Sequence, residues 1–283
     1  MSTSINDDLF PSSNEQLGIT SVALSEQENR YYFAVRYSNG KKVLDLGCGL
    51  GFGSHILRRN AEVVFGIDIS ESSISFSSNS YSDSNLFFLL GDGSNLPFPD
   101  NYFDMITCFE VIEHIDDHDN FLNECKRVLN SKGLFLCSTP NKRFHSGYWN
   151  KPLNPFHNQE FNMEDFYKLI SSNFHVRSFH GQSVMSTSSR FKCEFYLLAL
   201  KLLNLSGIIY NHYNKERGHS FWVLSYKSNP IINLIFKLAD NVLNIKQEKP
   251  KLNGDHHIKG DSVEVTPLSS SNTKYVVSVA QKL

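Results

Sequence analysis

Two glutamates and a histidine lie close together in the segment Glu110-Val-Ile-Glu113-His114. Positions i, i+3 and i+4 share one face of a helix, so we expect these three side chains to converge if the segment turns helically. Two carboxylates and an imidazole form half of a site for a divalent cation such as Mg²⁺ or Mn²⁺. His157, in NPFHNQEF (154–161), is the predicted fourth ligand.

The same histidines can also do chemistry without a metal. An imidazole titrates near neutral pH, so His114 or His157 is a candidate general base for a hydroxyl group. The residue types leave the metal-bound and the metal-free site open.

A glycine-rich turn follows an apolar strand in VLDLGCGLGFG (43–53) and opens a helix. Glycine has no Cβ, so the backbone of such a turn can meet a ligand at close range. The spacing is Gly47-x-Gly49-x-Gly51, and Phe52 stands where the dinucleotide fingerprint G-x-G-x-x-G requires its third glycine. The turn therefore indicates a nucleotide-like ligand other than a dinucleotide.

Two aspartates end the next two predicted strands. Asp68 closes VVFGID (63–68), where a carboxylate can accept hydrogen bonds from both hydroxyls of a ribose. Asp92, in LLGDGSNLPF (89–98), ends the following strand and can accept from an adenine amino group. A single strand-end carboxylate is usually an ordinary turn residue. Two of them after a glycine turn favour a nucleoside ligand.

From Lys42 onward, short β-branched or aromatic runs alternate with longer helical patterns, which predicts an α/β fold with a parallel sheet. A helix at 24–37 precedes the first strand, and 174–181 and 274–283 alternate as further strands. We predict the other strands near 42–46, 62–67, 86–90, 103–109 and 133–138, and the other helices near 52–60, 70–79, 117–129 and 163–172.

The chain divides into a core and two additions. Residues 1–40 form an N-terminal lead-in and helix, and residues 41–181 with 273–283 form the predicted core. Residues 182–272 are a predicted helical insertion, a lid or a dimer element, whose polar part 246–272 is expected to be a mobile loop.

Composition narrows the class of protein. The 283 residues carry a net charge of −2 and no dense run of lysine and arginine, which disfavours a nucleic-acid partner. The five cysteines form no C-x-x-C pair, and the N-terminus is polar and acidic, which favours a reduced, cytoplasmic protein. The apolar stretch 195–210 is shorter than a bilayer span, so no transmembrane segment is expected.

The motif D-x-G-C-G-x-G, together with LPFPDNYFDMITCFEVIEHI (96–115) and STPNKR (138–143), resembles the class I S-adenosylmethionine-dependent methyltransferases. The resemblance implies a Rossmann-like, mostly parallel seven-stranded sheet with an antiparallel last strand and S-adenosyl-L-methionine as cofactor. The residues implied at the methionine end are Gly47, Cys48 and Gly49 through their backbone, Phe109 through its carbonyl, and Arg30 with Tyr31 over the carboxylate.

At the nucleoside end, the resemblance implies that Asp68 binds the ribose with Ile69 beside it, and that Asp92 and Gly93 meet the adenine. The segment E-V-I-E-H with a later H-x-x-E-[FW] resembles metal-assisted 2′-O-methyltransferases of small RNA, and E-V-I-E-H also recurs in quinone-precursor O-methyltransferases. His114 and His157 are the candidate catalytic residues of the metal-free alternative, whereas this likeness implies a metal site. Its ligands would be Glu110, Glu113, His114 and His157.

The later segments STPNKR, NPFHNQEF, MEDFYKLI (163–170) and FHVRSFHGQ (174–182) resemble methyltransferases of bacterial polysaccharide biosynthesis. The implied acceptor is a hydroxyl of a sugar, nucleotide sugar or glycan. Aromatic residues that could stack on such a ring are Phe144, Tyr148, Trp149 and Phe156. The alternatives are a phenol or natural-product O-methyltransferase, or a non-catalytic cofactor-binding partner protein. A homodimer through 182–272 is a further expectation.

Overall fold

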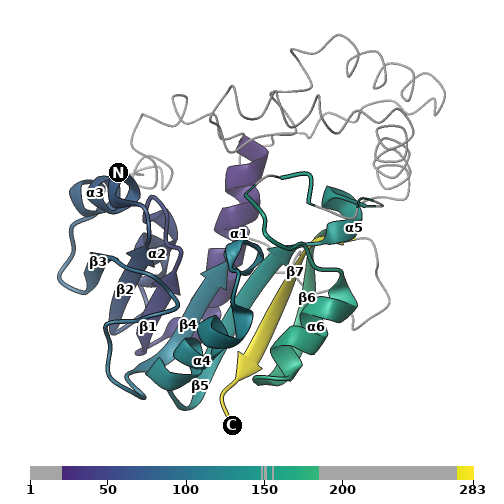
Figure 1. Cartoon of the computed structure of the whole chain (residues 1–283). Coiled ribbons are helices and arrows are strands. Elements are labelled where there is room, and N and C mark those ends of the chain that lie inside the picture. The colour runs from purple at the N-terminus through teal and green to yellow at the C-terminus, as the bar shows by residue number, and fades with distance from the viewer. Residues whose placement is uncertain (1–20, 148, 150–151, 155, 185–272) are drawn as a thin grey trace.

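The computed structural model describes residues 21–147, 149, 152–154, 156–184 and 273–283 (Figure 1). Their strands form one seven-stranded sheet in the order β3-β2-β1-β4-β5-β7-β6. Strands β1 to β5 pair in parallel, whereas β7 runs antiparallel to β5 and β6. The predicted fold class is confirmed. The strands are β1 (Lys42–Leu46), β2 (Val63–Asp68), β3 (Leu86–Leu90), β4 (Phe103–Phe109), β5 (Leu129–Pro140), β6 (His175–Val184) and β7 (Thr273–Gln281).

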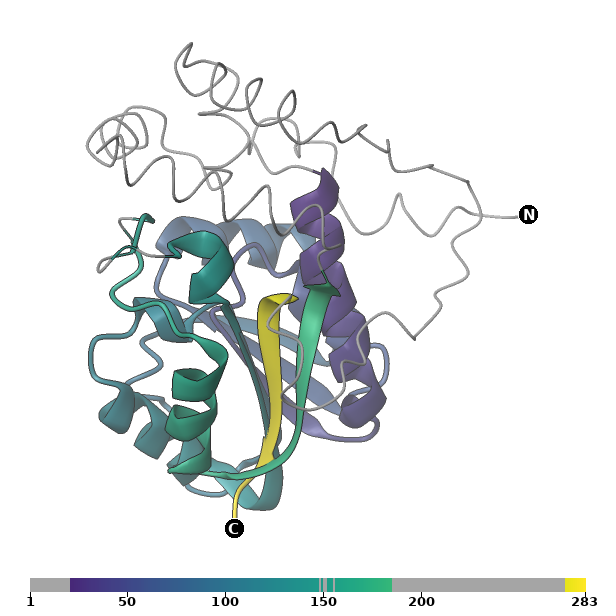
Figure 2. The ribbon, with the colours of Figure 1, turned by 90° about the vertical axis from the view of Figure 1, so that its right-hand side faces the viewer.

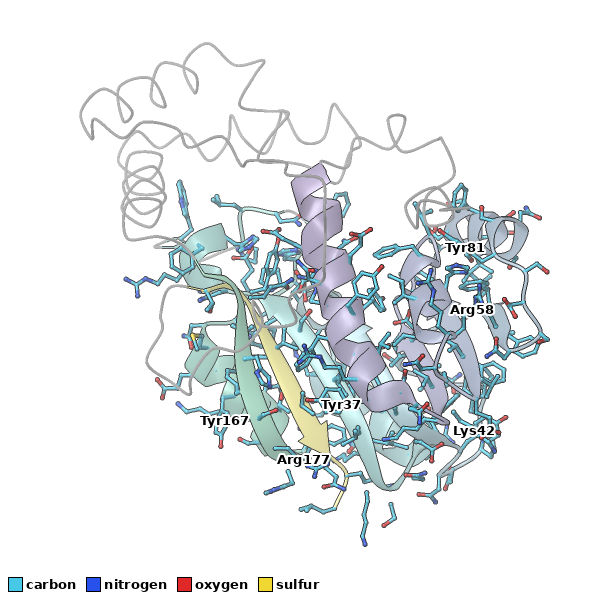
Figure 3. All side chains as sticks on the ribbon, turned by 180° about the vertical axis from the view of Figure 1, so that it is seen from behind. Tyr37, Lys42, Arg58, Tyr81, Tyr167 and Arg177 are labelled. Atoms are coloured by element: carbon cyan, nitrogen blue, oxygen red, sulfur yellow. The ribbon has the colours of Figure 1, made fainter. Side chains whose placement is uncertain are left out.

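Helices cover both faces of this sheet, as Figure 2 shows edge-on. On one face α1 packs on α2, and seen from behind α1 lies across the sheet with Tyr37 near its lower end (Figure 3). On the other face lie α4 and α6 (Figure 1). The α-helices are α1 (Ser21–Ser38), α2 (Phe52–Leu57), α3 (Glu71–Ser80), α4 (His118–Val128), α5 (Lys142–His145) and α6 (Met163–Ser171).

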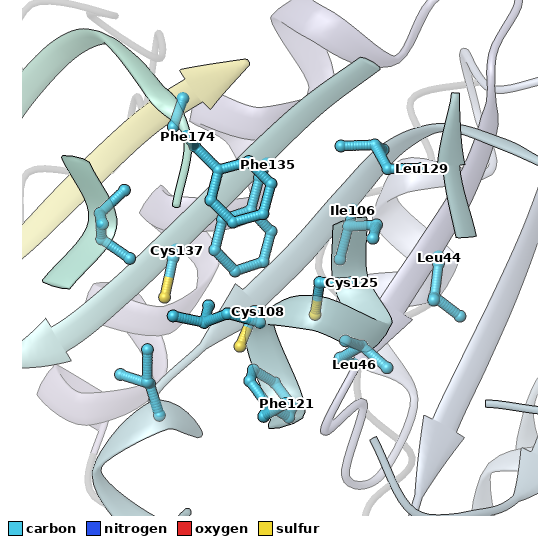
Figure 4. Close-up of a cluster of buried hydrophobic side chains, with 14 of the residues drawn as sticks. Leu44, Leu46, Ile106, Cys108, Phe121, Cys125, Leu129, Phe135, Cys137 and Phe174 are labelled. Atoms are coloured by element: carbon cyan, nitrogen blue, oxygen red, sulfur yellow. The ribbon is translucent and has the colours of Figure 1, made fainter. Parts of the chain in front are cut away.

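Two apolar clusters fix these layers. One joins Leu44 and Ile106 of the sheet to Phe121 of α4 and Phe166 of α6, and the close-up in Figure 4 shows part of it. The other joins Val43 and Met105 to α1 and α2. Because both faces are covered, the central strands read as continuous apolar runs rather than as alternating ones.

Side-chain caps set where three helices begin. Ser70 accepts a hydrogen bond from the amide of Ser73, and Asp117 accepts one from the amide of Asn120. Asn162 caps α6 in the same way. Each cap satisfies an amide that the first turn of a helix leaves without a partner. The predicted helix starts near 70, 117 and 163 agree with these caps.

Three details differ from the predicted elements. Helix α2 ends at Leu57 rather than near 60, and β5 begins at Leu129, directly after α4, rather than near 133. The short helix α5 was not predicted. The proposed insertion, its loop 246–272 and its suggested dimer role lie outside the described residues, apart from Gln182–Val184, which belong to β6. No helix among the residues that are described is long and apolar enough to cross a membrane.

Strand order decides where a ligand can bind. The chain moves from β1 outward to β3 and then crosses back to β4 on the other side of β1. In open α/β sheets, such a reversal leaves a crevice at the carboxyl ends of the two central strands. The glycine turn after β1 and the segment Glu110–His114 after β4 both lie at this edge.

Candidate active site

The glycine turn depends on left-handed backbone. Gly47, Gly49 and Gly51 have φ angles of 70°, 53° and 84°, a region that side chains rarely enter. A Cβ on Gly47 would collide with Val111, whereas one on Gly49 would have no heavy atom of the described residues within 4 Å. Gly47 therefore packs the turn against the segment after β4, and Gly49 borders open space.

The amides of the turn are already used inside the protein. Gly47 and Cys48 both donate to the carbonyl of Ile67, at 2.8 and 3.0 Å, and Gly49 donates to Asp68 Oδ2 at 2.9 Å. These three amides hold the turn on β2.

Asp68 is fixed at the end of β2. Its Oδ1 accepts from the amide of Ser70 at 2.9 Å, and its Oδ2 accepts from Gly49. Each carboxylate oxygen keeps a second lone pair, which two ribose hydroxyls can use. The neighbouring Ile69 is 78% exposed, so an apolar side chain borders this acid without a cover.

The turn after β3 lies beside Asp68, because the amide of Gly91 donates to the carbonyl of Asp68 at 3.0 Å. Asp92 is exposed, and its Oδ1 accepts only from the amide of Ser94 among the described residues, at 2.8 Å. At Gly93 a Cβ would stand 2.6 Å from the ring of Phe121. The structure thus brings the two predicted nucleoside-binding acids to one edge.

Strand β1 holds a buried acid, just before the glycine turn, that the sequence analysis did not identify. Asp45 is fully buried in β1 and accepts hydrogen bonds from the hydroxyls of Tyr31, Ser54 and Thr107, at 3.1, 2.6 and 2.7 Å. Burial raises the pKa of Asp45 to about 6, against the lowering effect of these three donors. Asp45 is the first residue of the motif D-x-G-C-G-x-G, and this position is the sequence signal that could have identified it.

Tyr31 therefore has a different partner from the one the resemblance implied. Its hydroxyl proton is directed to Asp45, and its ring packs edge-on against Phe52 and Phe109 and fills the space beside Gly53. Phe109, at the end of β4, is likewise buried. Tyr31 supports the glycine turn from behind.

Glu110 does not share a helical face with Glu113 and His114. Its φ is 59°, and only Ile112–His114 forms a helical turn, of the 3₁₀ type. Its carboxylate accepts from the hydroxyl of Ser138 at 2.7 Å. The expectation of an i, i+3, i+4 face is wrong, because the strand ends in a left-handed residue before the turn begins.

Three of the four predicted ligands do converge. One ligand atom from each of Glu113, His114 and His157 lies within 4.8 Å of the others, and Glu110 is not part of this group. The ring centroids of the two histidines are 4.9 Å apart. The loop that carries His157 is held by the amides of Asn158 and Gln159, which donate to the carbonyl of Glu113 at 2.8 and 3.1 Å.

Hydrogen bonds at Nδ1 orient both imidazoles. His114 Nδ1 lies 2.7 Å from the carbonyl of Phe156, which can only accept, so this nitrogen carries a proton. His157 Nδ1 lies 2.9 Å from Oε1 of the buried Glu160. In a neutral ring that is protonated at Nδ1, the nitrogen with the free lone pair is Nε2, so Nε2 can bind a metal or accept a proton. This is the outer-shell pattern that metal-binding histidines usually show.

Glu113 completes the group as a buried carboxyl, 1% exposed, that accepts from Thr139 Oγ1 at 3.2 Å. Burial, and then the negative charge of Glu110, raise its pKa well above the usual range. A nearby cation would favour the charged form. The donor set of one carboxylate and two imidazoles suits a transition metal better than Mg²⁺, which prefers oxygen ligands.

Residues 44–137 match the methyltransferase domain family. The matched range begins in β1, ends in β5 and contains the glycine turn, Asp68, Asp92 and the segment Glu110–His114. This part of the chain is a class I S-adenosylmethionine-dependent methyltransferase domain.

The matches between this methyltransferase domain and its curated relatives cover only part of each relative's length. A Mycolicibacterium smegmatis protein, named a probable S-adenosylmethionine-dependent methyltransferase, is 35% identical over 53% of this chain and 60% of its own. A fatty-acid O-methyltransferase of the same organism is 33% identical over 47% and 52%. A ubiquinone biosynthesis O-methyltransferase of Coxiella burnetii is 35% identical over 37% and 46%. The chain thus spans about half the length of the curated relatives it matches.

A solved structure of a candidate methyltransferase from Bacillus halodurans shares the fold, with a TM-score of 0.54 and 17% identity over 90% of this chain and 99% of that one. S-adenosylmethionine suits the residues described above. The open space at Gly49, the fixed acceptor Asp68 and the uncovered Ile69 fit a ligand with an adenosine part. In the methyltransferase domain, the edge of the sheet with the glycine turn and Asp68, here called the cofactor edge, therefore lies beside the group of Glu113, His114 and His157.

Proposed function

We propose that the whole protein is an S-adenosylmethionine-dependent O-methyltransferase. The observation that carries this proposal is the group Glu113, His114 and His157 directly beside the cofactor edge. Val111 packs against Gly47, so the segment that carries Glu113 touches the turn that would hold the methyl donor. Methyl transfer from a sulfonium chiefly needs alignment of the acceptor and removal of its proton.

The chain's own residues can perform both tasks. His157 accepts the hydroxyl proton at Nε2, and Glu160, held at Nδ1, stabilises the imidazolium that forms. The methyl carbon leaves the sulfonium sulfur and bonds to the acceptor oxygen, so an ether, or an ester from an acid, and S-adenosylhomocysteine are the products. His114, oriented by the Phe156 carbonyl, borders the same oxygen.

As an alternative to His157 acting as the base, we propose that Glu113, His114 and His157 hold a divalent transition metal. When bound, such an ion makes the acceptor hydroxyl more acidic and can grip two neighbouring oxygens. The protein contributes orientation. Glu160 and the carbonyl of Phe156 lock the two imidazole tautomers, and Thr139 positions the carboxylate. Mn²⁺ fits this donor set better than Mg²⁺.

A sugar or glycan hydroxyl is the acceptor class that we propose first. Of the aromatic residues considered for stacking, Phe156 is 57% exposed and supplies the carbonyl that orients His114. Phe144 is buried, and Tyr148 lies outside the described residues. Phe156 can therefore receive the apolar face of a sugar ring beside the group.

Small-molecule acceptors are the second candidate, and the names of two relatives favour them. One relative is named a fatty-acid O-methyltransferase and another a ubiquinone biosynthesis O-methyltransferase. The exposed ring of Phe156 suits an apolar acceptor as well as a sugar. Intact glycines and acids at the cofactor edge do not favour a non-catalytic partner protein.

Transfer of a labelled methyl group tests the proposal. The full-length protein is stripped of metal and assayed with nucleotide sugars, glycans, catechols and fatty acids, with Mn²⁺, Mg²⁺ or a strong chelator. We expect methylation of a hydroxyl acceptor, stimulated more by Mn²⁺ than by Mg²⁺. Unchanged activity under chelation would exclude the metal role and leave His157 as a base. Cofactor binding without any methylated product would reject the enzyme.

A further inference from the structure

A buried arginine, Arg30, directly precedes Tyr31 in α1. Arg30 of α1 is 2% exposed, and its Nη1 donates to Gln182 Oε1 at 2.7 Å. Its guanidinium carbon lies 4.7 Å from the ring centroid of Tyr275. Its Nε makes no hydrogen bond, and no carboxylate of the described residues lies within 4.0 Å of it. The guanidinium is therefore buried without an ion-pair partner among the residues that the structure describes.

The neighbours of Arg30 are fixed by other bonds. Gln182 Nε2 donates to the backbone carbonyl of Glu26 at 2.6 Å, which turns Oε1 toward the arginine. The carboxylate of Glu26 accepts from the hydroxyl of Tyr275 at 3.1 Å. Gln182 and the ring of Tyr275 thus hold one side of the guanidinium. No hydrogen bond to a described residue is made along its Nε–Nη2 edge.

An open Nε–Nη2 edge matches a carboxylate, because its two parallel N–H groups meet the two oxygens of one acid group. A buried charge without a partner lowers the free energy of unfolding, and a cation–π contact offsets only part of that loss. The buried guanidinium therefore does not stabilise the fold. It would instead strengthen the binding of a ligand that supplies an anionic group.

Strand order places this cation away from the nucleoside end. Tyr275 pairs with Pro140 of β5 and with Gln182 of β6. The glycine turn and Asp68 follow β1 and β2. Adjacent strands are spaced about 4.8 Å apart, so β7 lies roughly 14 Å from β1 along the sheet. The two residues of β5 just before Pro140, Ser138 and Thr139, hold Glu110 and Glu113.

We propose that Arg30, positioned by Gln182 and Tyr275, binds a carboxylate group of the methyl acceptor and thereby selects acidic acceptors. The proposal rests on the proposed O-methyltransferase activity and adds a specificity-determining residue to it. A uronic-acid sugar or an organic acid would satisfy the Nε–Nη2 edge. The carboxylate of the cofactor's methionine part is the competing source of the same chemistry.

Matched acceptors and three variants test this assignment. Wild type, Arg30→Met, Arg30→Lys and the control Arg36→Met, on the exposed side of the same helix, are assayed with glucuronate against glucose. Calorimetry measures binding of S-adenosylhomocysteine and of 5′-methylthioadenosine, which lacks the carboxylate, to each protein. Thermal denaturation reports whether each variant folds.

We expect Arg30→Met and Arg30→Lys to lower kcat/KM for the acid of the pair by about 30-fold or more, with the neutral acceptor and S-adenosylhomocysteine binding little changed. Arg30→Lys keeps the charge without the fork, so it tests the assignment if the methionine variant does not fold. Loss of S-adenosylhomocysteine affinity with unchanged 5′-methylthioadenosine affinity would assign Arg30 to the cofactor instead.

Retention of the acid preference in both Arg30 variants would show a structural role and overturn the proposal. A wild-type protein that methylates none of the acceptors refutes the proposed activity rather than the subsite. In that case, calorimetric titration of glucuronate into the protein with bound S-adenosylhomocysteine still decides the subsite. Binding that Arg30→Lys removes supports it, and equal or absent binding in both proteins refutes it.

Discussion

The imidazoles of His114 and His157 meet edge to face, with ring planes 77° apart and centroids 4.9 Å apart. They come from two segments, the turn after β4 and the loop before α6. Backbone bonds from Asn158 and Gln159 to Glu113 join those segments. The pair is thus built by a docked loop, and each ring is held at Nδ1.

Replacing His157 should separate chemistry from cofactor binding. We expect His157→Ala to bind S-adenosylhomocysteine normally and to lose about 10²–10⁴-fold in turnover, because the positioned proton acceptor is lost. Calorimetry and single-turnover methyl transfer measure the two effects. His175→Ala, at an exposed position of β6, is the matched control. Full turnover in His157→Ala would refute the role assigned to this residue.

Asp68 should control cofactor affinity. In Asp68→Asn, one charged acceptor of the ribose hydroxyls is lost and the bond from the Gly49 amide is weakened, so affinity should fall about 10²-fold. Fluorescence or calorimetric titration with S-adenosylhomocysteine checks this. Asp100→Asn, which removes a surface contact with Arg127, serves as control. Equal affinity of Asp68→Asn and wild type would contradict the ribose assignment.

The buried Asp45 should make stability depend on pH. Its folded pKa, about 6, is raised above the usual aspartate value of 3.8. Its contribution is therefore complete below about pH 4 and is lost as pH rises through about 6. Relative to Asp45→Asn, wild type should lose up to about 3 kcal/mol of unfolding free energy over this window.

Urea denaturation of wild type and Asp45→Asn between pH 4 and 8 measures that difference. The gap between the two proteins should level off above about pH 7, where Asp45 is ionised in both the folded and the unfolded chain. A gap that is constant across the whole range would mean that Asp45 is not the titrating group.

Two glycine substitutions should separate packing from ligand contact. In Gly53→Ala the new methyl group collides with the buried ring of Tyr31, so stability should fall by about 1–3 kcal/mol. Gly49→Ala meets no protein atom within 4 Å, but its backbone is left-handed, which costs about 1–2 kcal/mol.

Cofactor affinity then distinguishes the two variants. The alanine methyl group at 49 occupies the space that we assign to the ligand, so Gly49→Ala should bind S-adenosylhomocysteine much more weakly than its stability alone explains. Thermal denaturation together with calorimetry provides both quantities. Normal binding by folded Gly49→Ala would place the ligand elsewhere.

The sequence by itself determined the strand and helix order and the cofactor edge. Those features depend on local information: apolar periodicity marks the strands, and glycine at positions 47, 49 and 51 marks a turn whose backbone can approach a ligand closely. Asp68 and Asp92 could be placed because parallel strands bring their carboxyl ends to one edge. Local patterns of this kind do not depend on distant residues.

Only the tertiary structure decided how the side chains share their partners. No local pattern revealed that the Tyr31 hydroxyl donates to Asp45, or that Glu110 leaves the predicted face because its backbone is left-handed. Nor did any pattern reveal that Glu160 and the Phe156 carbonyl set the two imidazole tautomers. The contact between Arg30 and Gln182 joins residues 152 positions apart. Such bonds depend on which strands and loops the folded chain brings together, and residue spacing does not encode that.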